Sequence, residues 1–401
     1  MNYWFSVISC LVIWIGSGCR PAPVTSPAET PQTAAAETPS ESPAPTPPPL
    51  KIIDVGVFLP LKGEAQASGE AALNGLIVAA EEINAKGGID GQLIRLIVRD
   101  TKSQADRAGE AVQNLLEVDH VVAVVGGVSA GSDEAARMAN KLKIPMLALG
   151  STMPGIPDKE PWVFRLSSVD FFSAKVMARF SPTIEATRAI VLYDIYSPYA
   201  RNLGVAFTQH FKSGPMNVVA GESYDLTSRD FSKPLTMIKR KNPDVIYLPA
   251  PADQAAEIIK QARALGLNMP FLGTGSWDSP EFLSAAGDAA NDCYIPARYN
   301  PEPTTDSGRA FSDAYKLKHS TPPPAMAALG YDALKVLVDA IAASGGIDHE
   351  GVGDALRSIV NFSGVTGPIT FNPESLISYP ISILKAEDGK LVFLETIAPQ
   401  D

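Results

Sequence analysis

Residues 127–131 read Gly-Val-Ser-Ala-Gly and fit the pattern G-x-S-x-G. In serine hydrolases this pattern holds the nucleophilic serine on a sharp turn between a strand and a helix. Here it follows an apolar run, 121–126, and precedes a helix-like run, 132–142. The same turn has a second use, because unpaired N–H groups at a helix N-terminus bind a carboxylate without attacking it. Ser129 is therefore either a nucleophile or part of a cradle for an anionic ligand.

Hydrolysis by Ser129 needs a histidine base and an acid that orients this base. His319 and His349 follow the serine in the required order, but both lie in segments that we expect to be exposed connections. His120 precedes the apolar run, and His210 lies in a helix-like segment. The sequence therefore favours a ligand cradle over an esterase, and we expect no enzymatic activity. A plain turn without a function is the other alternative.

Composition limits the partners that the protein can have. The chain has 401 residues, 45% of them hydrophobic, and a formal net charge of −11. This length allows two domains with cores of their own. The acidic balance speaks against nucleic acid, because binding its phosphates requires lysine and arginine. The cysteines and histidines lack the spacing of a zinc site, so we expect neither a metal nor another cofactor.

Residues 1–19 form an apolar run that is too short for a permanent membrane helix and ends in small residues. This pattern predicts a signal peptide for export. Its end, Gly-Ser-Gly before Cys19, resembles the box at which bacterial lipoproteins are cleaved and lipidated. Two features depart from that box: no lysine or arginine precedes the apolar run, and Gly16 stands where leucine is usual. An ordinary cleaved signal and an uncleaved anchor are the alternatives.

Residues 20–50 are rich in proline, alanine and threonine, with almost no large apolar side chains. Such a segment cannot bury enough surface to offset the entropy of ordering, so we expect a disordered, extended tether. With a lipid on Cys19, this tether would hold the folded body near a membrane, in the periplasm or on another extracytoplasmic face. Cys293 lies in an apolar stretch and is expected to be a small buried residue.

From Lys51 onward, apolar runs alternate with helix-like segments. The run 52–60 is rich in β-branched residues without alternation, as buried parallel strands are. The segment 68–88 has apolar residues at helical spacing and ends in two glycines. Where strand, helix and strand follow one another without hairpin signals, right-handed crossovers should join the strands into parallel sheets. Further strands are expected at 93–100, 121–126, 144–150, 189–194, 216–225, 244–250 and 270–275, and further helices at 103–117, 132–142, 197–212, 231–241 and 253–267.

The chain contains an internal repeat of this plan. Residues 120–152 and 244–275 share a strand, a short loop, a helix, an X-Pro pair and a strand that ends in glycine and serine or threonine. Two lobes of like architecture explain this, with their loops at the carboxyl ends of strands, where open α/β sheets bind ligands. Two or three helices follow, the clearest at 322–346. Short strands at 367–372, 379–384 and 390–395 end the chain.

Four stretches, 58–104, 121–154, 231–267 and 364–372, resemble one known family. They are similar to the type I periplasmic binding proteins, in the leucine/isoleucine/valine-binding branch that delivers ligands to ABC importers. The most specific motif is EINAKGGIDG in the first stretch. The resemblance implies an α/β fold of two Rossmann-like lobes with parallel central sheets.

The family has three hinge crossovers between its lobes, which we expect near 167–170, 297–300 and 367–371. Lobe 1 would then comprise residues 51–168 and 299–366, and lobe 2 would comprise 169–298 and 367–401.

The resemblance also implies where a ligand binds. In the family, the loop after the third strand and a second turn hold the ligand's α-carboxylate through small side chains and backbone N–H groups. The matching residues are Ser129, Ala130 and Ser132 in that loop and Gly150, Ser151 and Thr152 in the second turn. Asp133 and Glu134 put negative charge into the first turn of the same helix, which weakens its attraction for an anion.

The match is less complete in the second lobe. Tyr199 falls on a tyrosine that could stack over the ligand, although it could also be a packing residue. Two aromatic positions of the amino-acid pocket fall near Ser68 and Ala252, where aromatic side chains are absent. The acid that holds the ligand's ammonium group is replaced by Gly-Ser-Trp at 275–277.

Three interpretations of this replacement stay open. Asp278 or Asp253 takes over the missing acid, Trp277 covers an apolar or cationic group, or the pocket no longer binds amino acids. Ser276, Trp277 and Asp278 are therefore expected site residues, with packing between secondary-structure elements as the alternative role of Trp277.

We therefore expect a monomeric lipoprotein that clamps a small amino-acid-like, carboxylate or amide ligand and presents it to an ABC permease. A sensor that uses the same clamp without transport is one alternative, and a serine hydrolase built on Ser129 is the remote one.

Overall fold

The computed structural model describes residues 51–128, 131–150, 161–166, 170–211, 217–225, 227–303, 305–371 and 380–397. The predicted signal peptide and tether, with Cys19, lie outside these ranges. Residues 49–401 belong to one compact unit.

Of the described residues, five strands make up a first sheet in the order β2-β1-β3-β4-β5, and all of them are parallel. Neighbouring residues of β1 point into different cores, since Val57 and Phe58 belong to two separate clusters of buried side chains. Burial on both faces explains why these strands are apolar without alternation. The strands are β1 (Ile52–Leu59), β2 (Leu93–Asp100), β3 (Val124–Gly126), β4 (Met146–Ala148) and β5 (Val163–Arg165).

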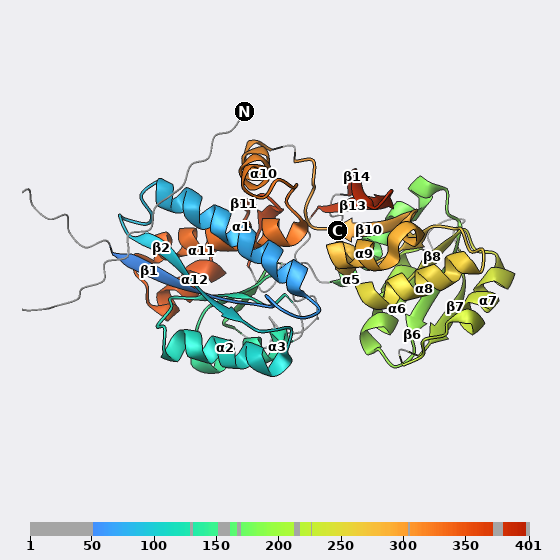
Figure 1. Ribbon diagram of the computed structural model, residues 1–401, viewed down its shortest axis with the longest axis horizontal. Helices are drawn as coiled ribbons and strands as arrows, with labels where there is room; N and C mark the ends of the chain where they lie inside the picture. Colours follow the sequence, from blue (N-terminus) through green and yellow to red (C-terminus); the bar gives the residue numbers. More distant parts are fainter. Residues whose placement is uncertain are drawn as a thin grey trace, which may run out of the picture. The chain divides into compact units, whose positions relative to one another are not determined.

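Helices cover both faces of the first sheet (Figure 1). On one face α1 crosses α11 so closely that a Cβ on Gly75 would clash with the carbonyl oxygen of Ala327. Likewise, a Cβ on Gly330 would meet the carbonyl oxygen of Ala72. We call this sheet with its helices the first lobe. The helices are α1 (Gln66–Ala85), α10 (Asp306–His319), α11 (Ala325–Ser344) and α12 (His349–Arg357) on one face, and α2 (Ala105–Glu117) and α3 (Ser132–Leu142) on the other.

Within the same described ranges, seven strands form a second sheet in the order β14-β13-β10-β9-β8-β6-β7. Ile190 and Val191 of β6 again enter two different cores, so this sheet is also covered on both faces. We call the sheet with its helices the second lobe. Its strands are β6 (Arg188–Asp194), β7 (Asn217–Tyr224), β8 (Val245–Tyr247), β9 (Phe271–Leu272), β10 (Cys293–Ala297), β13 (Ile381–Glu387) and β14 (Lys390–Ile397). Its helices are α5 (Asp170–Phe180) and α6 (Pro198–Phe211) on one face and α7 (Ser232–Lys241), α8 (Ala252–Ala264) and α9 (Pro280–Ala286) on the other.

The central strands of the second sheet are parallel, as predicted, and two further strands extend the sheet at one edge. Strand β13 pairs antiparallel with both β10 and β14. Asp388 and Gly389 join β13 to β14 with positive φ angles of 50° and 73°, which suits a tight hairpin turn. A turn of two residues leaves no room for a crossover, so antiparallel pairing follows.

In the part of the chain that the structure describes, successive elements change from one lobe to the other after β5, after β10 and after β12. A small hairpin of β11 (Phe362–Gly364) and β12 (Gly367–Ile369) precedes the last passage. Asp332 of α11, which is 1% exposed, anchors its turn by accepting hydrogen bonds from the N–H groups of Val365 and Thr366, both at 2.8 Å. Burial raises the pKa of Asp332 to about 6, against the lowering effect of the hydrogen bonds from Thr366 and Val365. The residue limits of the lobes stay a prediction.

Candidate functional site

The carboxyl ends of the first lobe's strands enclose a small hollow. It lies where β1, β2 and β3 end and α3 begins, and its volume of about 10 Å³ has room for one water molecule. Because adjacent parallel strands end at the same edge of a sheet, this is the edge at which open α/β sheets bind ligands. The hollow is lined by Phe58, Pro60, Thr101, Ala108, Gly127, Val128 and Ser132.

Two glycines shape the loop between β3 and α3. Gly127 and Gly131 have φ angles of +75° and +91°, which favour glycine. A Cβ on Gly131 would also come within 2.7 Å of the Cα and oxygen of Ala105. As N-cap residue of α3, Gly131 has no side chain to cap the helix, and the next residue, Ser132, lines the hollow. The two glycines of G-x-S-x-G thus allow the chain to turn into α3, and the first turn of this helix lies at the hollow.

The two predicted carboxylate loops begin at adjacent strand ends. Leu149 donates its N–H to the oxygen of Gly126 at 2.8 Å, and Gly150 donates to Gly127 at 3.0 Å. These bonds bring the ends of β3 and β4 together, so the two loops start from neighbouring points. The other predicted residues of the two loops, Ser129, Ala130, Ser151 and Thr152, lie outside the described residues.

In the second lobe, Tyr199 and Ala252 begin the helices α6 and α8 and are half-buried against different cores. Ser276 is exposed and lies in a short 3-10 helix, Gly275–Trp277, with its hydroxyl 2.8 Å from that of Thr274. This short helix replaces the end of the strand predicted at 270–275. The strand stops at Leu272.

Trp277 is a core residue in this structure. It is 0% exposed, its indole N–H donates to the oxygen of Ala250 at 2.8 Å, and its ring stacks on Phe282 at 4.9 Å. A side chain buried in this way presents no surface to a ligand, so the observed arrangement supports its alternative role in packing. Trp277 fixes the turn in which Asp278 lies.

Asp278 is the unusual titratable group of the second lobe. The residue is partly exposed, and partial desolvation of its carboxyl group raises its pKa to about 7. Among the described residues, no side chain forms a hydrogen bond or ion pair with it. Because loss of solvent disfavours the charged form of a carboxyl group, a proton or a nearby cation would stabilise this group.

Further acids lie at the same edge of the second sheet. Asp194 ends β6 and is 4% exposed, and Asp253 is in the first turn of α8. Burial, together with the negative charges of these two acids, raises the pKa of Tyr224, whose hydroxyl donates to Oε1 of Gln254 at 2.8 Å. The sequence indicated Asp253 as a candidate but not Asp194 or Tyr224, because only the strand order β8-β6-β7 brings these residues together.

Ser68, predicted near the ligand, contacts the second lobe. Its N–H donates to Oε1 of Glu281 at 3.1 Å, and its hydroxyl lies 3.3 Å and 3.5 Å from the two carboxylate oxygens. No sequence signal identifies Glu281, because it is 213 positions further along the chain.

Three histidines among the described residues make contacts away from the loop after β3. His349 Nε2 lies 3.1 Å from the oxygen of Val121, which precedes β3, whereas Ser129 follows the other end of that strand. His319 packs on the ring of Tyr315 at 4.4 Å, and His210 bonds to a carbonyl oxygen within α6. These contacts favour the cradle interpretation of Ser129.

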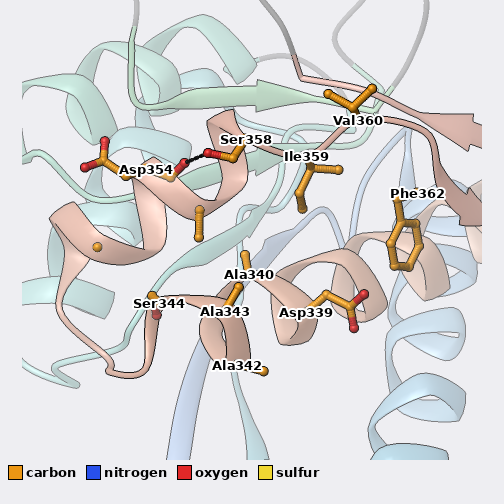
Figure 2. A pocket seen from close by; sticks show the side chains of 12 residues that line it. Asp339, Ala340, Ala342, Ala343, Ser344, Asp354, Ser358, Ile359, Val360 and Phe362 are labelled. Atoms are coloured by element: carbon orange, nitrogen blue, oxygen red, sulfur yellow. Dashed lines mark hydrogen bonds between the residues drawn. The ribbon is translucent and has the colours of Figure 1, made fainter.

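A larger cavity of about 800 Å³ lies elsewhere on the first lobe, between α11, α12 and β11 (Figure 2). Alanines with Ile359, Val360 and Phe362 line most of it, and Asp339 and Asp354 are its acids. It is separate from the carboxyl ends of the strands, and nothing in the structure indicates an occupant.

The described residues contain no group of three or more His, Cys, Asp and Glu side chains that could hold a metal ion. Over the same residues, no helix combines the length and the apolar character that crossing a membrane requires.

Comparison with known proteins identifies relatives along almost the whole body. Residues 52–390 match the model of a family described as periplasmic binding protein. The Leu/Ile/Val-binding protein BraC3 of Rhizobium johnstonii is 27% identical over 351 residues, which cover 86% of this chain and 94% of the relative.

Two solved structures have the same fold. The branched-chain amino acid transporter substrate-binding protein LivJ of Streptococcus pneumoniae, in complex with isoleucine, superposes with a TM-score of 0.79 at 28% identity. It covers 87% of this chain and 100% of its own. The leucine-binding protein LivK of Thermotoga maritima gives a TM-score of 0.77 at 28% identity, with coverages of 87% and 99%.

Proposed function

Because the chain belongs to the periplasmic binding protein family, in its Leu/Ile/Val-binding branch, we propose that it is an extracytoplasmic solute receptor for an ABC importer. It binds a small amino-acid-like ligand between its two lobes and carries out no chemistry on it. A monomer with lobes 51–168 plus 299–366 and 169–298 plus 367–401 closes by bending at the three connections. The closed form is the one that the permease recognises.

In this proposal the first lobe binds the ligand's carboxylate. The supporting observations are the hollow at the strand ends, the uncapped start of α3 and the hydrogen bonds that join the two loops. Backbone N–H groups at such a helix start attract a negative charge. The binding residues are Ser129, Ala130, Ser132, Gly150, Ser151 and Thr152.

The observation that carries the proposal is Asp278, a partly exposed acid that has no side-chain partner among the described residues. Asp278 follows β9, at the carboxyl edge of the second sheet. An ammonium group placed against it would supply the missing countercharge, so we propose that Asp278 replaces the acid absent at position 275. Tyr199 and Ser276 contact the ligand beside it, and Trp277 supports the turn from within the core.

A ligand panel tests this function. Thermal melts of the full chain would be recorded with L-isoleucine, L-leucine, leucinamide and 4-methylpentanoate, the last of which lacks the ammonium group. A ligand at about 100 times its Kd stabilises the protein by about 2.7 kcal/mol, a shift of several degrees. Shifts with the two amino acids alone would support the proposal. Shifts with 4-methylpentanoate alone would contradict the role of Asp278, and no shift with any of them would contradict the ligand class.

We also propose that a lipid on Cys19 anchors the protein to a membrane, with residues 20–50 as the tether. Cys19→Ser removes the thiol that would carry the lipid, so the variant should move from the membrane fraction to the soluble fraction. Immunoblots of fractionated cells measure this, with Cys293→Ser as the control. A Cys19→Ser protein that stays with the membrane would contradict the lipid anchor.

A further inference from the structure

Helix α1 begins without a cap of its own. Its N-cap residue is Ala65, no side chain forms a capping hydrogen bond, and its first turn contains no acidic residue. The first N–H groups of a helix lack partners within the helix and carry its positive dipole end. A negatively charged acceptor from elsewhere would therefore stabilise this helix start.

Glu281 of the second lobe supplies that acceptor. Ser68 is the third residue of α1, and its N–H and hydroxyl both lie within hydrogen-bonding distance of the Glu281 carboxylate, at 3.1 Å and 3.3 Å. Hydrogen bonds to an ionised group are stronger than those between neutral groups. Both residues are half-buried, which limits screening by solvent.

The turn that holds Glu281 also holds Asp278. Ser279 caps α9 by accepting a hydrogen bond from the N–H of Phe282 at 3.2 Å, and Phe282 stacks on the buried Trp277. Pro280 occupies the first helical position, where its fixed φ angle stiffens the turn. Residues 277–282 thus form one rigid piece with Asp278 near its start and Glu281 near its end.

We propose that Glu281 and Ser68 form a latch between the lobes that slows the release of a bound ligand. The latch rests on the proposed clamp. Opening the lobes must separate the Glu281 carboxylate from the start of α1, whereas a ligand that is bound by both lobes keeps these two groups close together. Glu281 is a positioning residue, because it acts through lobe closure and not through contact with the ligand.

Dissociation kinetics test the latch in the full chain, with L-isoleucine as the probe. Glu281→Ala should raise the dissociation rate constant about tenfold, since a charge-assisted contact is lost, with little change in the association rate constant. Glu281→Gln keeps an acceptor without the charge, and Ser68→Ala keeps the N–H donor, so each should raise the rate constant about threefold. Asp288→Ala, which removes an exposed acid from the same lobe, is the matched control.

The double variant distinguishes a contact from two separate effects. If Ser68 and Glu281 act through each other, adding Ser68→Ala to Glu281→Ala should change the rate constant no further. Two outcomes would overturn the latch. One is that the effects of the two substitutions on the dissociation rate constant are fully additive. The other is that Glu281→Ala releases L-isoleucine as slowly as the Asp288→Ala control.

Small-angle scattering of the ligand-free chain separates failure of the latch from failure of the proposed function. Glu281→Ala should increase the radius of gyration relative to Asp288→Ala, because the lobes part more often. If the unmodified chain does not bind isoleucine, the proposed ligand class is wrong. The radius of gyration of the ligand-free chain then tests the latch by itself. An unchanged radius of gyration would then overturn it.

Discussion

The edges at which the two sheets end differ in charge. In the first lobe, this edge presents the uncapped start of α3 and two loops joined by hydrogen bonds between Gly126, Gly127, Leu149 and Gly150. In the second lobe, the corresponding edge presents carboxyl groups, of which Asp278 has a raised pKa of about 7 because desolvation disfavours its charged form. One edge is suited to an anion and the other to a cation.

This difference arises although both edges are built on the same β/α plan. The backbone alone gives the first lobe its anion-binding character, since any helix start offers N–H groups. The second lobe needs particular side chains, because a cation requires an acid at the right place. The first lobe should therefore set the requirement for a carboxylate, and the second lobe should decide what else the ligand carries.

Removing the side chains of the carboxylate cradle is expected to have the largest effect. Ser129→Ala combined with Thr152→Ala should abolish measurable ligand binding while the melting temperature of the ligand-free protein stays nearly unchanged. Calorimetric titration with L-isoleucine and thermal melts measure the two quantities. A collapse of the ligand-free melting temperature would instead show that the pair is structural.

The stability of the second lobe should depend strongly on the buried side chain of Trp277. Trp277→Ala should lower the free energy of unfolding by about 3–5 kcal/mol, since it removes a fully buried aromatic side chain. Trp162, which is partly exposed and lies 5.7 Å from the guanidinium of Arg357, is the control in the first lobe and should cost less on truncation. Urea unfolding measures both variants. A Trp277→Phe chain with full stability but weakened isoleucine binding would make Trp277 a ligand contact.

Neutralising Asp278 should distinguish the contributions of the two sheet edges to ligand binding. Asp278→Asn should weaken L-isoleucine binding by about 3 kcal/mol, or about 100-fold, because the ligand's ammonium group loses its partner inside a closed site. Binding of 4-methylpentanoate, if measurable, should not weaken. Asp253→Asn, which changes an exposed acid nearby, is the control. Equal isoleucine affinities for the two variants would contradict the assignment of Asp278.

The raised pKa of Asp278 predicts a smaller, pH-dependent effect. The free protein holds a proton on this group below pH 7, and an ammonium ligand requires it to be released. Affinity for L-isoleucine should therefore be constant well above pH 7 and fall by about tenfold per pH unit below it. Titrations between pH 5 and 9 measure this dependence, and Asp278→Asn should abolish it. A slope that persists in the variant would point to another group, such as Asp332, whose pKa is raised to about 6 by burial.

Much of the architecture could be predicted from local patterns. The apolar, β-branched run at 52–60 and the helical spacing in 68–88 correspond to β1 and α1, because both depend on residues close in sequence. The prediction of the last strands was less complete. Their positions were close, but their antiparallel pairing to β10 depends on an element about ninety residues earlier, which no local pattern encodes.

The candidate site shows the same division. The glycines at 127 and 131 indicated the helix start at 127–132. In the structure both have positive φ angles, which favour glycine. It could not indicate that Trp277 is buried, since exposed and buried tryptophans look alike in a sequence and only packing against Phe282 separates them.

The sequence by itself determined the α/β class, the two repeats and the loop that begins with Gly127, because periodicity and turn chemistry act over a few residues. Only the tertiary structure decided which side chains meet. Desolvation raises the pKa of the Asp278 carboxyl group, which has no side-chain partner among the described residues. Ser68 reaches Glu281 across 213 positions of sequence. Such contacts depend on the packing of distant elements, and this packing sets the charges that the second lobe presents.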